Sequence, residues 1–290
     1  MNNLSWQLWR DRRGRLSAVR IAALALLLFP LAKALVDAGA IVNGARPLND
    51  LIHRAGFWAL VFLGVTMAIT PFRRIARYGS LIDVRRMLGL GTFLYISAHL
   101  VLYIADQRYD VAKIFHELTT RVYLIVGGIA WLGLAVLAAT STDGMVRRIG
   151  GQRWRRLHQA IYAIALLSLI HYFQQTKADI SVPTFVAGLF TWLIGYRLFA
   201  WWQGGGELTT LRLLVLSMVV ALLTFAGEAI GIGLMFGVSP LRVLGSAFDF
   251  EAGIRPGWQV LAAGLVVVAI DLVRARWSSQ PSRTRTAAAE

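Results

Sequence analysis

The chain has 290 residues, of which 57% are hydrophobic and 16% charged, and its mean hydropathy is +0.59. A water-soluble domain of this length needs less apolar surface to fill its core, so the composition predicts an all-α integral membrane protein. Cysteine is absent, which excludes disulfides, thiolate iron–sulfur sites and covalent haem attachment. Lys and Arg outnumber Asp and Glu by 30 to 15, as expected of either a nucleic-acid surface or basic cytoplasmic loops.

Eight apolar runs are long enough to cross about 30 Å of hydrocarbon. The first follows five arginines and resembles a signal sequence, but we expect an uncleaved anchor because the topology requires an inside N-terminus. The runs lie at about 20–38, 52–72, 87–105, 122–140, 156–174, 182–202, 209–235 and 257–275.

The distribution of cations distinguishes the two explanations of the positive charge. With both termini inside, 21 of the 30 cations fall on the cytoplasmic side, eight fall outside, and Lys33 lies within the first run. This asymmetry satisfies the positive-inside rule. The sequence therefore predicts a multi-pass membrane protein with N-terminus and C-terminus inside, in contact with lipid and without a nucleic-acid partner.

Three consecutive glycines, Gly204 to Gly206, interrupt the apolar pattern after the sixth run and indicate a flexible link. We therefore expect a cytoplasmic segment at 1–19, a six-helix transmembrane domain at 20–203 and a two-helix extension at 204–276. The Ser/Arg/Ala-rich segment 277–290 is expected to be a disordered cytoplasmic tail.

Two of the five histidines occupy equivalent positions in two apolar runs. His99 lies thirteen residues beyond Arg86, and His171 lies thirteen beyond His158, which follows a second arginine pair. At 1.5 Å per residue both lie about 20 Å from the start of helices that run from inside to outside. Two imidazoles at one depth on parallel helices can ligate the two faces of a b-type haem.

The alternative is that each histidine is a packed polar residue whose ring N–H bonds a backbone carbonyl. Burial in a membrane makes that role costly, and the matched depth favours ligation. The spacing also poses a geometric problem. Thirteen residues at about 100° each place His158 and His171 about 140° apart on an ideal helix, so either the helix departs from ideality or the two serve different neighbours.

The remaining histidines have less defined roles. His158 lacks a partner at its own depth; it could ligate a second haem, bind a propionate or quinone, or be an interfacial histidine beside arginines. His53 opens the second run, and His116 lies in an outer loop with Asp106, Asp110 and Glu117. We expect both to be solvated rather than metal ligands.

Several segments resemble one family, the haem-binding membrane subunit of the bacterial methionine sulfoxide reductase system (MsrQ, formerly YedZ), within the ferric-reductase-like transmembrane group. The matching segments are IHRAGFWALVFLGVTMAITPFRR (52–74), RRMLGLGTFLYISAHLVLY (85–103), LAATS (137–141) and RWRRLHQAIYAIALLSLIHY (153–172). The resemblance implies a six-helix haem-binding bundle, with the remaining two helices as an extension. It also implies that the family's three haem-associated histidines correspond to His99, His158 and His171.

The resemblance further implies a location in the bacterial inner membrane, b-type haem, FMN, electrons taken from the quinone pool, and delivery to a periplasmic molybdenum-containing subunit that reduces methionine sulfoxide in oxidised proteins. The chain would then be an electron-transfer subunit of an oxidoreductase system and not itself the catalytic reductase. One alternative is a ferric or superoxide-producing transmembrane reductase fed by a separate cytosolic flavoprotein. A different class, a haem-free transporter or structural membrane protein, requires polar groups lining a midplane cavity, and the sequence offers few.

Charged residues outside the histidine motifs have two interpretations each. The arginines at 73–86 and 147–156 could bind a flavin phosphate or haem propionates, or could be basic loops that contact anionic lipid. Glu228, within an apolar run, either handles protons or bonds to a neighbouring helix. We expect Asp271 to pair with Arg274, three residues later.

Overall fold

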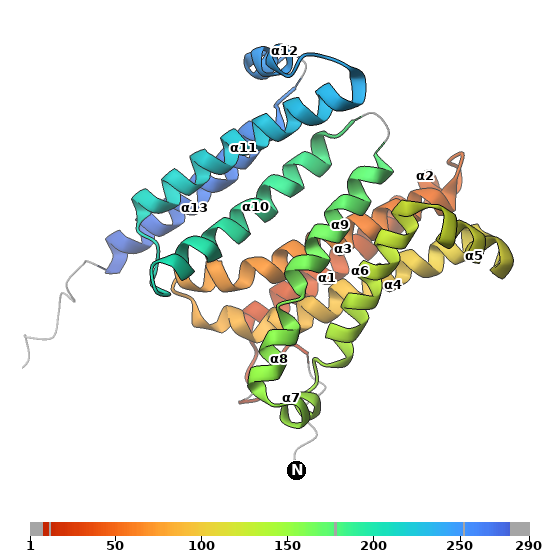
Figure 1. Cartoon of the computed structure of the whole chain (residues 1–290). Coiled ribbons are helices and arrows are strands. Elements are labelled where there is room, and N and C mark those ends of the chain that lie inside the picture. Colours follow the sequence, from red (N-terminus) through yellow and green to blue (C-terminus); the bar gives the residue numbers. More distant parts are fainter. Residues whose placement is uncertain (1–7, 12, 177–178, 252, 279–290) are drawn as a thin grey trace, which may run out of the picture. The chain divides into compact units, whose positions relative to one another are not determined.

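The computed structural model describes residues 8–11, 13–176, 179–251 and 253–278 (Figure 1). In this part of the chain, regular structure is helical apart from one isolated bridge between Arg10 and Leu16, which confirms the all-α class. The long helices are α1 (Ala18–Val36), α3 (Pro47–Ile75), α4 (Arg85–Asp106), α6 (Val122–Ala139), α9 (Ile161–Gln175), α10 (Ser181–Trp202), α11 (Thr210–Phe236) and α13 (Pro256–Ser278). The short ones are α2 (Ala38–Val42), η2 (Gly79–Val84), α5 (Val111–Thr120), α7 (Asp143–Ile149), α8 (Gly151–His158), α12 (Pro240–Gly245) and η3 (Ser246–Phe248).

Among the described residues, seven helices are long and apolar enough to cross a membrane, where the sequence predicts eight. The difference lies in the predicted fifth span, 156–174, which the structure divides into α8 and α9 with residues 159–160 between them. The 15 residues of α9 reach only about 22 Å at 1.5 Å per residue. Hydropathy misses the division because Gln159 and Ala160 leave the average of the run high.

The chain forms two compact units. Unit 1 comprises Met1–Thr70 and Ser80–Lys177, and unit 2 comprises Pro71–Gly79 and Ala178–Glu290. Helix α10 thus belongs with α11 and α13, and the boundary lies before it, whereas the glycine run suggests a boundary after it at 203–204. The expected tail falls largely outside the described residues, which end at 278.

In unit 1 the ends of the helices alternate as expected for successive membrane crossings. Figure 1 shows α2 and α5 at one end of this unit and α7 at the other. Helix α1 packs on α4 where Gly91 leaves room for the Leu27 side chain, and the Tyr95 hydroxyl donates to the Leu27 carbonyl at 2.7 Å. Pro30 lies one turn further along α1 and has no N–H to donate to the Leu26 carbonyl, which precedes the carbonyl bonded by Tyr95.

Helix α6 packs closely on α9. Gly133 faces Ile164, and a Cβ at position 133 would lie 2.8 Å from the Ile164 side chain. Ala165, the next residue of α9, is also buried. Small residues at such crossings let two backbones approach closely, which is how helices associate in a membrane without a hydrophobic driving force between them.

Unit 2 is built on α10, α11 and α13, which also cross at small residues. Gly188 on α10 faces Thr224 and Val260, and Gly264 on α13 faces Ser217. The buried Ser217 hydroxyl accepts a hydrogen bond from the Trp192 indole N–H at 3.0 Å. The Ser217 and Thr224 hydroxyls donate to carbonyls of their own helix, so the polar groups of these two side chains are satisfied, as burial in an apolar environment requires.

The expected Asp271 to Arg274 ion pair is wrong. Asp271 instead accepts a hydrogen bond from the Thr210 hydroxyl at 2.6 Å, and Arg274 donates to the Ala76 carbonyl at 2.7 Å. Both bonds lie within unit 2 and link α13 to other segments of that unit. Spacing of three residues permits a pair on an isolated helix, but here each side chain has a better-placed partner off the helix.

Candidate haem site between helices α4 and α9

His99 on α4 is half-buried and held by the backbone of α3. Its Nδ1 lies 2.8 Å from the Ile52 carbonyl oxygen. A carbonyl can only accept, so Nδ1 carries the proton and Nε2 keeps its lone pair. A ring held in this way has the tautomer and orientation of a metal-ligating histidine.

His171 on α9 is held in the same way by α6. Its Nδ1 lies 2.8 Å from the Tyr123 carbonyl oxygen, so its Nε2 is also free of the proton. One part of the alternative interpretation, a packed histidine whose ring N–H bonds a backbone carbonyl, therefore holds for both residues, because each ring makes such a bond. That bond, however, leaves free the nitrogen that would ligate a metal.

The structure brings the two rings together, as the matched depth predicts. Their centroids are 6.2 Å apart and their planes make an angle of 89°. A metal ion bound at about 2 Å by a nitrogen of each ring separates the ring centroids by roughly 6 Å. Two neutral imidazoles, each with Nδ1 occupied by a carbonyl, are a donor set that fits the iron of a b-type haem.

The division of the fifth span resolves the geometric problem of His158. This residue ends α8, whereas His171 lies within α9, so the two are not on one continuous ideal helix. His158 Nε2 lies 3.1 Å from the Thr140 hydroxyl oxygen, and the Trp154 ring stacks on its imidazole at 3.9 Å. Trp154 also donates to the Thr140 carbonyl at 2.8 Å, which fixes α8 against the end of α6.

His158 thus has the opposite arrangement to the other two histidines. The Thr140 hydroxyl lies closest to the Val136 carbonyl, at 2.8 Å, so its single proton goes there and His158 Nε2 donates to the hydroxyl oxygen. The free ring nitrogen of His158 is then Nδ1. Ligation of a second haem through Nε2 would require this hydrogen bond to be given up.

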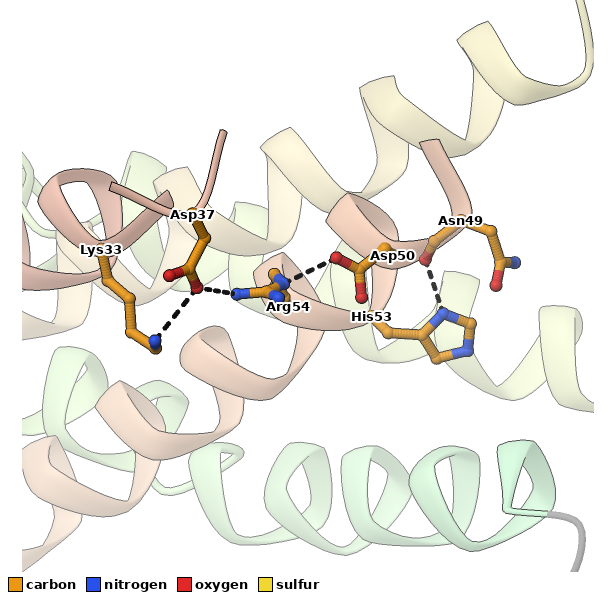
Figure 2. Close-up of polar contacts among 6 residues, drawn as sticks. All are labelled: Lys33, Asp37, Asn49, Asp50, His53 and Arg54. Atoms are coloured by element: carbon orange, nitrogen blue, oxygen red, sulfur yellow. Dashed lines mark hydrogen bonds and ion pairs between the residues drawn. The ribbon is translucent and has the colours of Figure 1, made fainter. Parts of the chain in front are cut away.

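The other two histidines lie at the surface, as expected. His53 lies in the second turn of α3, is exposed, and its Nδ1 lies 2.7 Å from the Asn49 carbonyl oxygen (Figure 2). His116 is exposed on α5, where Glu117 bonds to Tyr103 and Arg121. In the described part of the chain, no group of three or more His, Asp and Glu side chains is placed to hold a metal ion.

Three of the arginines considered as cofactor ligands contact other parts of the protein. Arg86 pairs with Asp143 at 2.7 Å, which joins α4 to α7 in unit 1. In unit 2, Arg77 pairs with Glu207 at 3.4 Å and Arg74 donates to the Gly205 carbonyl at 3.4 Å. These contacts fasten loops, in agreement with the interpretation of the arginines as ordinary basic loops.

The residues that hold the two histidines are not apparent from the sequence. Ile52 and Tyr123 act through their backbone carbonyls, which every residue type offers. The sequence feature that could have pointed to these carbonyls is a glycine inside a helical run. Gly56 follows Ile52 by four residues, and Gly127 follows Tyr123 by four. A glycine at such a position indicates close approach of another group.

The family model "Ferric reductase like transmembrane component" matches residues 55–169, so this part of the chain is similar to ferric-reductase-like transmembrane proteins. The chain is 44% identical over 170 residues (58% of this chain, 77% of the relative) to the protein-methionine-sulfoxide reductase heme-binding subunit MsrQ of Xanthomonas campestris pv. campestris strain B100, and 38% identical over 195 residues (66% and 90%) to that of Ralstonia nicotianae. The chain belongs to the MsrQ family. No solved structure matches it significantly.

Family membership and the apolar helices together establish the location. Relatives at this identity come from bacteria, and the described residues include seven helices able to cross a membrane. The chain is therefore a multi-pass protein of the bacterial inner membrane. The predicted family and membrane location are both confirmed.

Proposed function

We propose that this chain is a b-type cytochrome, the electron-transfer subunit of a methionine sulfoxide reductase system. The observation that carries the proposal is the pair of imidazoles on α4 and α9, 6.2 Å apart, each with Nδ1 bonded to a backbone carbonyl. The names of the relatives support it, because they are called heme-binding subunits of a protein-methionine-sulfoxide reductase. The chain itself would not reduce the sulfoxide.

His99 and His171 would hold the haem iron as its two axial ligands. Bound haem supplies a centre that takes up and releases one electron at a time. The protein's part is to orient the two rings and keep their Nε2 atoms unprotonated through the carbonyls of Ile52 and Tyr123. Burial of both rings among helices reduces water access and so influences the reduction potential.

The electrons would come from the quinone pool and pass across the membrane to a periplasmic molybdenum-containing catalytic subunit, which repairs oxidised periplasmic proteins. The family resemblance is the support for this route, and it also implies FMN. We propose that the histidine pair belongs to a functional haem-binding domain, 20–203, followed by a two-helix extension, 204–276, although the last helix of that domain, α10, packs with the extension in unit 2.

His158 remains a candidate ligand for a second haem. Its support is its position in the family motif RWRRLHQ (153–159). The Thr140 hydrogen bond means that a second haem would either displace that bond or use Nδ1. Haem content measured for a His158 variant distinguishes one haem from two.

The test is an absorption spectrum of the purified, dithionite-reduced protein after expression with adequate haem. We expect a b-type spectrum that His99→Ala and His171→Ala each abolish or strongly perturb. His116→Ala is the matched control, because that histidine is exposed on α5. If His158→Ala halves the haem content, a second haem is present; if it leaves the content unchanged, there is one. A haem-free wild-type protein contradicts the cytochrome proposal.

The match to the ferric reductase model over 55–169 favours one alternative, a ferric or superoxide-producing reductase fed by a cytosolic flavoprotein. The identity of the electron donor distinguishes this alternative from the proposed cytochrome of the quinone route. Reduction of the haem by a soluble quinol analogue, without any cytosolic reductase, supports the quinone route. Reduction only with a flavoprotein and nicotinamide supports the alternative.

A further inference from the structure

The two histidines of the candidate haem site are held by two copies of one local arrangement. Each consists of a backbone carbonyl and the glycine four residues later on the same helix. The α3 seat is Ile52 with Gly56, and it holds His99; the α6 seat is Tyr123 with Gly127, and it holds His171. In a regular helix the glycine N–H donates to that same carbonyl, so ring and glycine share one acceptor.

Glycine is required in both seats because the ring lies directly on the helix backbone. A Cβ at position 56 would lie 2.9 Å from His99 Nδ1, and one at position 127 would lie 2.8 Å from His171 Nδ1. These separations are shorter than van der Waals contact. Any side chain at either position would therefore push the ring off the carbonyl to which it donates.

Two other glycines of the same unit contact no histidine and leave room for a side chain. Gly128 follows Gly127 on α6, and a Cβ there would make only an ordinary 3.7 Å contact with Leu118. Gly89 on α4 has the same 3.7 Å contact with Thr66. Both are half-buried, like the seat glycine Gly127.

We propose that Gly56 and Gly127 are positioning residues that fix the planes of the His99 and His171 imidazoles perpendicular to each other at the iron. The inference rests on the proposed function, since it concerns the same two ligands. The two rings make an angle of 89° while each donates to a carbonyl on a different helix, His99 to α3 and His171 to α6. Neither ring can rotate about the bond from its Nε2 to the iron without breaking the hydrogen bond from its Nδ1 to the carbonyl.

The orientation has an electronic consequence. Two iron d orbitals can overlap with the π system of the axial imidazoles. When the two imidazoles are parallel, they raise the energy of one of these orbitals above that of the other. Perpendicular imidazoles act on both orbitals equally, so the orbitals stay close in energy. Low-spin ferric haem then gives a highly anisotropic electron paramagnetic resonance (EPR) signal, and the reduction potential shifts with the orientation of the axial ligands.

The experiment compares Gly56→Ala and Gly127→Ala with the controls Gly89→Ala and Gly128→Ala, all in the full-length, haem-loaded protein. The readouts are haem content, the ferric EPR signal and the midpoint potential. We expect the wild type and both controls to share one highly anisotropic low-spin signal. Each seat variant should lose that signal, give a more rhombic one or become high-spin, with a shifted potential.

The outcomes separate the two proposals. A haem-free wild type, or His99→Ala and His171→Ala proteins with unchanged spectra, overturns the proposed function and this inference with it. If the histidine variants lose the haem signal but both seat variants keep the wild-type signal and potential, the inference alone is overturned. A wild-type signal typical of parallel imidazoles also overturns it.

A second variant covers the case in which alanine prevents folding. His171→Gly keeps Gly127 and leaves space for added imidazole, which can donate to the Tyr123 carbonyl. We expect imidazole to restore the low-spin signal at lower concentration than N-methylimidazole, which retains the ligating nitrogen but has no N–H to donate. Equal restoration by the two compounds contradicts a role for the α6 seat.

Discussion

The carboxylate of Glu228 lies 3.0 Å from the guanidinium of Arg255, and the side chains are 3% and 24% exposed. The pair joins the middle of α11 to the residue that precedes α13. Arg255 also donates to the Ser246 hydroxyl at 2.6 Å, so the connection between α11 and α13 is joined to the buried Glu228 carboxylate. Of the two roles considered for Glu228, bonding to a neighbouring segment is the one seen.

Replacement of Glu228 should therefore destabilise unit 2. We expect Glu228→Ala to lower the free energy of unfolding by about 3 kcal/mol, the lower end for a broken buried pair, because Arg255 can reach water. Glu228→Gln should cost less, since the amide oxygen can still accept from Arg255. Thermal unfolding in detergent measures both. Glu207→Gln, which breaks the exposed pair with Arg77, is the control and should cost under about 1 kcal/mol.

A proton-transfer role for Glu228 gives a different pattern. Glu228→Gln would then slow quinol oxidation while leaving the melting temperature unchanged. That result would contradict the purely structural role that the ion pair indicates.

The crossing of α10 with α11 and α13 should tolerate no side chain at Gly188. A Cβ there would lie 2.5 Å from Val260 and 2.7 Å from the Thr224 hydroxyl. We expect Gly188→Ala to destabilise the protein by about 1–3 kcal/mol through overpacking. Gly227→Ala on α11 is the matched control, because no atom lies within 4 Å and alanine favours the helix by up to about 1 kcal/mol. Equal melting temperatures for the two variants would refute the tight crossing.

Asp37 should make stability depend on acid pH. It accepts hydrogen bonds from Lys33 at 3.0 Å and Arg54 at 2.7 Å, which lower the pKa of Asp37 below its ordinary value of 3.8 (Figure 2). A lowered folded-state pKa stabilises the protein above the unfolded-state pKa, and this contribution is lost as the pH falls through the folded-state value. The melting-temperature difference between wild type and Asp37→Asn should be largest near pH 6 and shrink towards pH 3. A difference that grows on acidification would contradict this.

The sequence predicts the meeting of His99 and His171 because axial rise is a property of every helix. Once two spans are predicted to run in the same direction from similar arginine pairs, the 13 residues from Arg86 to His99 and the 15 from Arg156 to His171 give similar depths. The carbonyls that hold the rings could not be predicted in the same way. They depend on which helices lie beside α4 and α9, and hydropathy carries no information about neighbours.

The errors have equally local causes. The division between α8 and α9 leaves average hydropathy almost unchanged, so a window over the sequence reports one span. Asp271 and Arg274 are spaced for a pair, but Thr210 and the Ala76 carbonyl come from segments distant in sequence. The glycine run at 204–206 marks the end of α10 correctly; membership of α10 in unit 2 depends on side-chain packing that glycine does not reveal.

The two carbonyl–glycine seats also determine the axial register of the helices. A slide of α3 by one residue would move the Ile52 carbonyl by about 1.5 Å along the axis and turn it by about 100°. Gly56 would move away from the ring with it, and a residue with a side chain would take its place. The same holds for α6 against α9. The ring contacts therefore fix α3 on α4 and α6 on α9 in a single alignment, which interchangeable aliphatic side chains along these spans would not do.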